Sequence, residues 1–141
     1  MGLDVGDRRI GVALSDPLGL TAQRLTLLER RSLAEDVKAV GELAARHGVE
    51  LIVVGLPLTL RGVLGPQAKK VEAFILALQR QGQVPVQRID ERLTTVQGHR
   101  ALREMGASRQ RRGQMIDQVA AQLILQHFLE MQRGASTTAP E

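Results

Sequence analysis

The sequence predicts a single α/β domain in which helices flank a mixed sheet of about five strands. Two short apolar runs on either side of the turn 6–9 indicate an antiparallel hairpin over residues 2–15. From residue 51 onward, strand and helix patterns alternate, which indicates parallel strands joined by right-handed crossovers. The chain has 141 residues, 43% of them hydrophobic and 24% charged, which suits one globular domain with a substantial core.

The first half of the chain is expected to supply three strands and one helix. A turn around residues 17–19 ends the hairpin, and the run Arg24–Glu29 fits a third strand. A helix then begins at Ser32, which lies three residues before Glu35 in the spacing of a capping box. Apolar residues follow at helical period until Gly48 ends the helix.

The middle of the chain reads as strand, loop, helix and strand. Leu51–Gly55 is a continuous, largely β-branched run, which is typical of a strand buried on both faces. The segment 59–65 carries two glycines and is expected to be a loop. Pro66 suits the first position of a helix that ends at Gly82. Val84–Ile89 is a strand with a proline near its start, which favours an edge position.

The last third of the chain is expected to be helical, with one interruption. Thr94 and Gln97 repeat the capping-box spacing and predict a short helix to about Met105. Gly106–Gly113 is rich in arginine and is expected to form a basic loop. A final helix is predicted over Gln114–Met131. These elements give a domain over residues 1–132 and a flexible tail over 133–141.

The composition excludes several classes of protein. Cysteine is absent, which rules out disulfides and thiolate metal sites. No apolar run reaches the length of about 18 residues that a membrane span requires, and the first residues lack the features of a signal peptide. We therefore expect a cytoplasmic protein that does not bind membranes.

The charge balance is compatible with a polyanionic partner. The net charge is +4, and only Lys38, Lys69 and Lys70 of the 19 basic residues are lysine, so the rest are arginine. Arginine binds phosphate through two parallel hydrogen bonds. Composition alone fits nucleic-acid binding and arginine enrichment by codon usage equally well.

Acidic residues from distant parts of the sequence are expected to meet at the carboxyl ends of the strands, where open α/β sheets form their sites. Asp4 lies inside the first strand, and a charge buried there is costly unless it is paired or binds a metal. Asp90 and Glu91 follow the last strand, and Asp117 lies early in the final helix, on the side of two alanines that allow close packing. Carboxylate oxygens suit Mg²⁺ or Mn²⁺, and two such ions can cleave a phosphodiester bond.

Each acid also has an ordinary structural interpretation. Asp4 could form a buried ion pair with an arginine, Asp90 could cap a turn or the short helix after it, and Asp117 could be favoured by the helix dipole. The occurrence of all three acids together favours a catalytic metal site over three separate structural roles.

Several motifs in order along the chain resemble the YqgF/RuvX family. They are Gly2-Leu-Asp-Val-Gly-x-x-Arg-Ile-Gly-Val-Ala13, Val54-Gly-Leu-Pro57, Asp90-Glu-Arg-Leu-Thr-Thr95 and Asp117-x-x-Ala-Ala-x-x-Ile-Leu125. The resemblance covers about residues 2–130. It implies an RNase H-like fold and a nuclease linked to Holliday junction resolution and to maturation of the 5′ end of pre-16S ribosomal RNA.

The resemblance also implies roles for individual residues. It makes Asp4, Glu91 and Asp117 the catalytic carboxylates that bind Mg²⁺ or Mn²⁺, with Asp90 as the alternative to Glu91. Precursor rRNA and branched DNA both remain open as substrates, and so do a monomer and a homodimer, since cutting a junction at two sites would need a dimer.

Basic residues near these acids are candidates for binding the nucleic-acid backbone, which positions a substrate without reading its sequence. They are Arg61, Lys69, Lys70, Arg92, Arg100, Arg103, Arg109, Arg111 and Arg112. The only aromatic residues, Phe74 and Phe128, occupy apolar helical positions, which argues against recognition by stacking bases on aromatic rings.

Two other functions are compatible with parts of the pattern. Actin-like and sugar-kinase ATPases share this type of fold and an Asp-x-Gly phosphate turn like Asp4-Val-Gly6, but they need two such lobes and the chain has length for one. A non-catalytic nucleic-acid-binding module would have no need of the acids.

Overall fold

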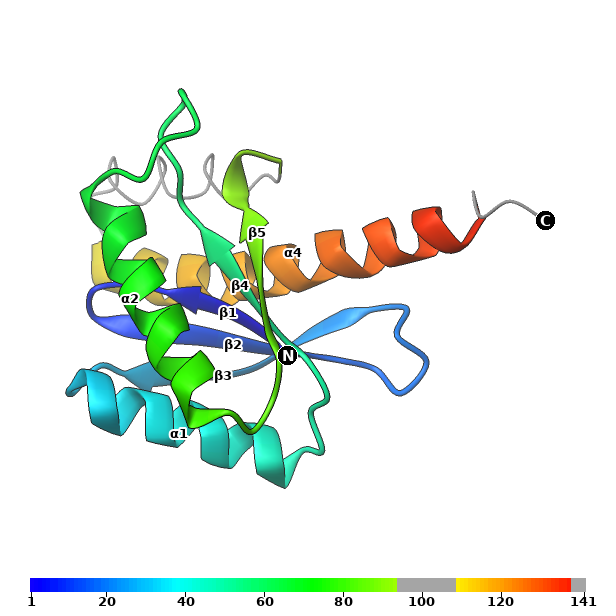
Figure 1. Cartoon of the computed structure of the whole chain (residues 1–141), viewed down its shortest axis with the longest axis horizontal. Helices are drawn as coiled ribbons and strands as arrows, with labels where there is room; N and C mark the ends of the chain where they lie inside the picture. Colours follow the sequence, from blue (N-terminus) through cyan, green and yellow to red (C-terminus); the bar gives the residue numbers. More distant parts are fainter. Residues whose placement is uncertain (94–108, 138–141) are drawn as a thin grey trace.

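A computed structural model of the chain describes residues 1–93 and 109–137, with the side chains of 93, 109–118 and 135–137 outside the described part. Its helices lie on both sides of one sheet (Figure 1). The elements are β1 (Gly2–Val5), β2 (Arg9–Ser15), β3 (Ala22–Glu29), α1 (Leu33–Arg46), β4 (Ile52–Leu56), α2 (Pro66–Gln81), β5 (Val86–Asp90), the 3₁₀ turn η1 (Glu91–Leu93) and α4 (Arg109–Thr137).

The sheet has five strands in the order β3-β2-β1-β4-β5. β1, β2 and β3 pair antiparallel, whereas β1 pairs parallel with β4, and β4 with β5. The leading hairpin, the parallel second half and the edge position of the last strand are therefore confirmed. The first strand in the sequence lies at the centre of the sheet.

Local sequence signals set the ends of the helices. The Ser32 side chain accepts a hydrogen bond from the Glu35 backbone N–H at 3.1 Å, as the capping box predicts. Pro66 begins α2, and Gly82 ends it in the left-handed conformation at φ 71°.

One face of the sheet is covered by α1 and α2. Alternate side chains of the three central strands, among them Leu3, Val5 and Val54, pack there against large apolar residues such as Phe74 and Ile75. We call this the α1/α2 face. It holds the larger part of the core.

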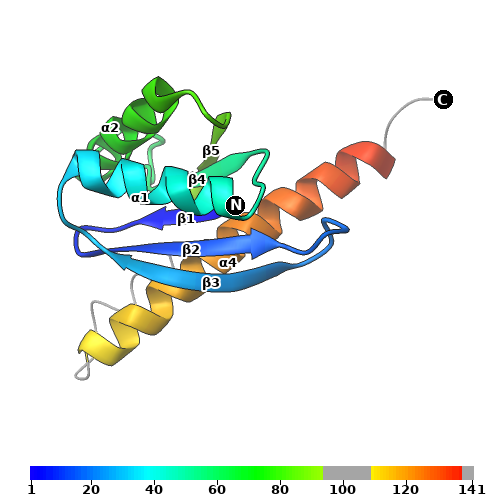
Figure 2. The same ribbon diagram turned by 90° about the horizontal axis from the view of Figure 1, so that it is seen from below.

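The opposite face is covered by α4, which crosses the sheet as a long diagonal helix (Figure 2). Its contact residues Ala120, Ala121 and Ile124 pack against strand residues that include Val53 and Ile89. We call this the α4 face. A Cβ on Gly2 would lie 2.7 Å from Cβ of Leu125, so helix and sheet approach closely here.

Two expectations for the end of the chain were wrong. Residues 109–113, expected to be part of a basic loop, form the start of α4, because arginine is a good helix former. The helix also continues past residue 132, where a flexible tail was expected, to Thr137. Arg133 anchors this extension by donating a hydrogen bond from Nη1 to the Leu20 carbonyl at 2.9 Å. The short helix expected over 94–105 lies outside the described residues.

None of the helices in the described ranges is both long and apolar enough to cross a membrane.

Candidate active site

Asp4 is fully buried at the centre of the sheet, on the α4 face. Its neighbours Leu3 and Val5 point into the α1/α2 core, so the alternation of a strand directs Asp4 to the other side. Gly2, two residues earlier, faces α4 in the same way. An acid at this position would be costly without compensating groups, and the structure gives Asp4 interactions of its own.

Glycines flank Asp4 on both neighbouring strands. Gly11 of β2 is its direct partner across the antiparallel pair. On the other side, Leu3 pairs with Val54 of β4, so Asp4 and Gly55 are at the next level of the parallel pair. The two strand positions directly level with Asp4 are therefore glycines, which contribute no side chain there.

Glu91 uses the space above Gly55. A Cβ on Gly55 would lie 2.7 Å from Oε1 of Glu91 and 2.4 Å from Cδ1 of Ile124. Glu91 is fully buried as the first residue of η1, two residues after Ile89, which packs on the α4 face. Its carboxylate thus lies over Gly55, one strand away from Asp4, and neighbouring strands are about 4.8 Å apart.

The two buried carboxylates fit a site for hard divalent cations, because they supply oxygen ligands from rigid elements. Among the described side chains, no group of three or more His, Cys, Asp or Glu residues lies close enough together to hold a metal ion. The third expected ligand, Asp117, belongs to α4, one turn before Ala121, whose carbonyl lies against Gly2. Its side chain lies outside the described part of the structure.

Asp90 has a different environment from Glu91. It pairs in register with Leu56, which faces the α1/α2 core, so it points away from the α4 face. Its carboxylate accepts hydrogen bonds from the backbone N, Nε and Nη2 of Arg92, at 2.9, 3.0 and 2.6 Å. The Arg92 side chain and backbone hold the pKa of Asp90 below its usual value.

Sequence reasoning missed Arg9 as a candidate. Arg9 is only 8% exposed and alternates with Ile10 and Val12, which face the α1/α2 core, so it lies on the same face as Asp4 and Gly11. The alternation Arg-Ile-Gly-Val-Ala after the turn was the signal that could have placed it there. A buried guanidinium on this face supplies positive charge on the side where the acids gather.

Of the basic candidates, four have described side chains. Arg61, Lys69 and Lys70 are exposed between β4 and the first turns of α2, and Lys70 lies 3.4 Å from Asp7 in the β1–β2 turn. Arg92 reaches toward the loop before α2 and donates to the Leu60 carbonyl at 3.4 Å. The other five lie outside the described side chains: Arg100, Arg103, Arg109, Arg111 and Arg112.

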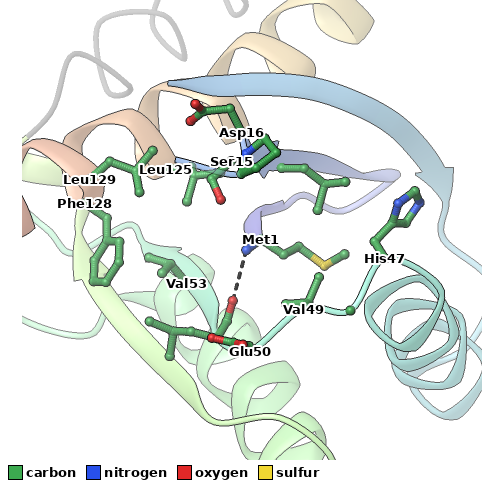
Figure 3. A pocket seen from close by; sticks show the side chains of 14 residues that line it. Met1, Ser15, Asp16, His47, Val49, Glu50, Val53, Leu125, Phe128 and Leu129 are labelled. Carbon is green, nitrogen blue, oxygen red and sulfur yellow. Dashed lines mark hydrogen bonds between the residues drawn. The ribbon is translucent and has the colours of Figure 1, made fainter. Parts of the chain in front are cut away.

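Figure 3 shows a cavity of about 560 Å³ that is lined by residues such as Met1 and Ser15. Met1 precedes β1 and Ser15 ends β2, so the cavity lies at the opposite end of the sheet from the acids. It is bounded by Met1, by Ser15 at the end of β2, by Val49 before β4 and by Phe128 in the second half of α4. The Met1 nitrogen donates to the Leu51 carbonyl at 3.0 Å at its edge. This cavity is therefore separate from the buried carboxylates.

The chain is similar in sequence to a known protein family and to several named proteins. A family model described as "RuvX: Holliday junction resolvase" matches residues 1–131. A protein of Moorella thermoacetica named "Putative pre-16S rRNA nuclease" is 58% identical over 130 residues, 92% of this chain and 93% of its own length. A protein of Clostridium novyi with the same name is 46% identical and covers 92% of this chain and 96% of its own.

Solved structures share the fold. RuvC of Thermus thermophilus in complex with a Holliday junction substrate superposes with a TM-score of 0.55 at 19% identity, covering 94% of each chain. RuvC of the same organism determined as a separate structure gives 0.52 at 18% identity over 94% of this chain and 95% of that one. The mixed five-stranded sheet is thus the RNase H-like fold expected from the sequence.

Proposed function

Because the chain belongs to the RuvX family, we propose that it is a divalent-metal-dependent nuclease that cleaves phosphodiester bonds in structured nucleic acid at Asp4 and Glu91. The observation that carries the proposal is the pair of fully buried carboxylates on the α4 face. Burying two carboxylates on one face of the sheet is costly unless their charge is compensated, and a bound divalent cation would supply that compensation.

The residues of the chain would each do a separate part of the work. Asp4 and Glu91 would hold Mg²⁺ or Mn²⁺, with Asp117 of α4 completing the set. When bound, such ions activate water and stabilise the leaving oxygen. Gly55 keeps the space into which the Glu91 carboxylate projects, and burial fixes both acids before substrate arrives.

The substrate is proposed from the relatives and from the surface. We infer that the chain acts on the 5′ end of precursor 16S rRNA, as the names of its relatives suggest, and this work would take place in the cytoplasm. Arg61, Lys69 and Arg92 would bind the phosphate backbone, and Arg109, Arg111 and Arg112 would join them from the start of α4. A four-way DNA junction is the competing substrate, and cutting it at two positions would require two copies of the chain.

The decisive experiment changes each acid to its amide and measures cleavage of a pre-rRNA 5′ leader and of a four-way junction in Mn²⁺, Mg²⁺ and EDTA. Asp4→Asn and Glu91→Gln should lower the rate on the order of a thousandfold, because several kcal/mol of metal-ion stabilisation are lost. Asp90→Asn should lower it less than about tenfold, because that acid binds Arg92 and faces the other way.

Glu72→Gln provides the matched control. Glu72 also forms an ion pair, with Arg88, but on the α2 side of β5 and away from the buried acids. The Glu72→Gln variant should cleave both substrates at the wild-type rate. Cleavage in EDTA, or equal losses for Asp90→Asn and Glu91→Gln, would contradict the proposed site.

A further inference from the structure

The loop between β4 and α2 displays apolar side chains to solvent. Leu60 is 87% exposed, Val63 57% and Leu64 39%, within one turn of five residues. The loop leaves the carboxyl end of β4, directly after Gly55 and Leu56 (Figure 1). Exposed apolar side chains that are clustered in this way often mark a surface that binds another molecule.

The loop is held in one conformation by its own hydrogen bonds. The Thr59 N–H donates to the Val63 carbonyl at 3.0 Å, and the Gly62 N–H donates to the Thr59 carbonyl at 2.8 Å. The Thr59 hydroxyl also accepts from the Val63 N–H at 3.2 Å. Gly62 adopts φ 79°, a left-handed conformation that side chains rarely take. The apolar tip is thus built in advance of any partner.

Arg92 ties this tip to the proposed active site. Its guanidinium packs against Gly62, where a Cβ would lie 3.0 Å from Nη1, and donates to the Leu60 carbonyl. Asp90 fixes the same guanidinium from the other side. Arg92 follows Glu91 directly in η1. The residue that contacts the Leu60 carbonyl is therefore the chain neighbour of the residue that carries the buried carboxylate.

The surroundings of the tip favour a nucleic acid over a protein as its occupant. The exposed cation Arg61 lies between Leu60 and Gly62, so the tip offers apolar surface and positive charge together, which matches a base and its phosphate. Both aromatic side chains, Phe74 and Phe128, are buried and unable to stack on bases. Aliphatic side chains can instead insert between bases whose stacking is interrupted.

We propose that Leu60 and Val63 form a wedge that contacts unstacked bases, so that the chain selects nucleic acid with an interrupted helix, such as a branch, a bulge or a helix end. The wedge would place that interruption beside Arg92 and bring the adjacent phosphate to Glu91 and Asp4. This inference rests on the proposed nuclease function and names the structural class of its substrate. A continuous duplex offers no opened step and should be bound only through its backbone.

The test uses a four-way junction and a bulged RNA hairpin, each with 2-aminopurine at the interruption, and a continuous duplex of equal length. Binding and fluorescence are measured in EDTA, which prevents metal-dependent cleavage. Wild type should raise the 2-aminopurine fluorescence and bind the interrupted substrates more tightly than the duplex. Leu60→Ser with Val63→Ser should lose the fluorescence rise and bind the interrupted substrates about tenfold more weakly, as expected for losing apolar contacts, with duplex affinity unchanged.

Leu18→Ser is the matched control, since Leu18 is 78% exposed in the β2–β3 turn at the other end of the sheet. It should behave as wild type. An unchanged fluorescence rise and an unchanged preference in the double variant would overturn the wedge, and the exposed tip would then serve another macromolecule. Cleavage by wild type in Mn²⁺ is measured separately, so an inactive wild type would count against the nuclease function without affecting the fluorescence result.

Discussion

The two faces of the sheet are built on opposite principles. On the α1/α2 face, large apolar side chains such as Phe74, Ile75 and Leu3 are fully buried between the sheet and the helices. On the α4 face, alanines and glycines bring the helix close, and Asp4 and Glu91 are buried among them. The α1/α2 face mainly stabilises the fold. The α4 face also buries charged groups, which lowers its contribution to stability.

The largest effect on stability should therefore come from the α1/α2 face. Phe74→Ala should lower the free energy of unfolding by about 3–5 kcal/mol, because it leaves a cavity at a fully buried position. It also removes the ring that lies 5.5 Å below the Arg30 guanidinium. Chemical denaturation measures the loss. A change below about 1 kcal/mol would show that the core on this face repacks easily. The α1/α2 face would then not be the main source of stability.

Gly55→Ala should have a smaller effect on stability and a large one on activity. The added methyl group would meet Cδ1 of Ile124 and Oε1 of Glu91, and overpacking of this kind costs about 1–3 kcal/mol. Adding Ile124→Val removes the Cδ1 atom and should restore much of the stability. Activity should stay low in the double variant, because the Glu91 carboxylate is still displaced.

A glycine on the other side of the molecule sharpens this test. In Gly41→Ala the three atoms nearest the new Cβ would all belong to the flexible end of the Gln81 side chain, and alanine favours the interior of α1. Its stability should be unchanged or slightly higher, with normal cleavage. If Gly55→Ala cleaved as fast as Gly41→Ala, the clearance above Gly55 would have no part in the reaction.

The smallest expected effect concerns Asp90, the neighbour of Glu91 on the opposite face. The Arg92 side chain and backbone lower the pKa of Asp90 below its ordinary 3.8, so the pair stabilises the fold above that value. Asp90→Asn should therefore cost no more than about 1 kcal/mol at neutral pH, as for exposed ion pairs.

This difference between wild type and Asp90→Asn should shrink as the pH falls through 3.8 and then through the lowered pKa of the folded state. Urea unfolding of both proteins at several pH values measures it. A difference that stayed constant down to acid pH would mean that the carboxylate charge is not what matters.

The fold and the first acid followed from the sequence for clear reasons. Asp4 stands between Leu3 and Val5 in a short strand, so alternation places it on the face opposite these two residues, and it is buried because α4 covers that face. The choice between Asp90 and Glu91 could not be made that way. They are adjacent at a strand end, where a shift of one residue exchanges the faces, and only the pairing of Leu56 with Asp90 fixes which acid points where.

Other features depended on contacts that local patterns do not contain. The sequence marks Gly55 only as part of a motif. Its lack of a side chain matters because Ile124 and Glu91, which are distant in the sequence, pack directly over it. The sequence indicated that Arg9 belongs to a polar turn, whereas in the structure it is the first residue of β2 and lies on the same face as Gly11. The start of α4 was mistaken for a loop because two glycines and a cluster of positive charge resemble a flexible segment.

The position of α4 after all five strands has a consequence for the order in which the fold can form during synthesis. During synthesis, β1 to β5 with α1 and α2 emerge first, and the α1/α2 face can close while the ribosome is still translating. The other face, with Asp4, Val53 and Ile89, stays uncovered until α4 has left the exit tunnel. Ribosome-bound chains that end before residue 109 should therefore bind chaperones and be cut by added protease along this side. The α4 face around Asp4 and Glu91 would be completed only once α4 has packed against the sheet.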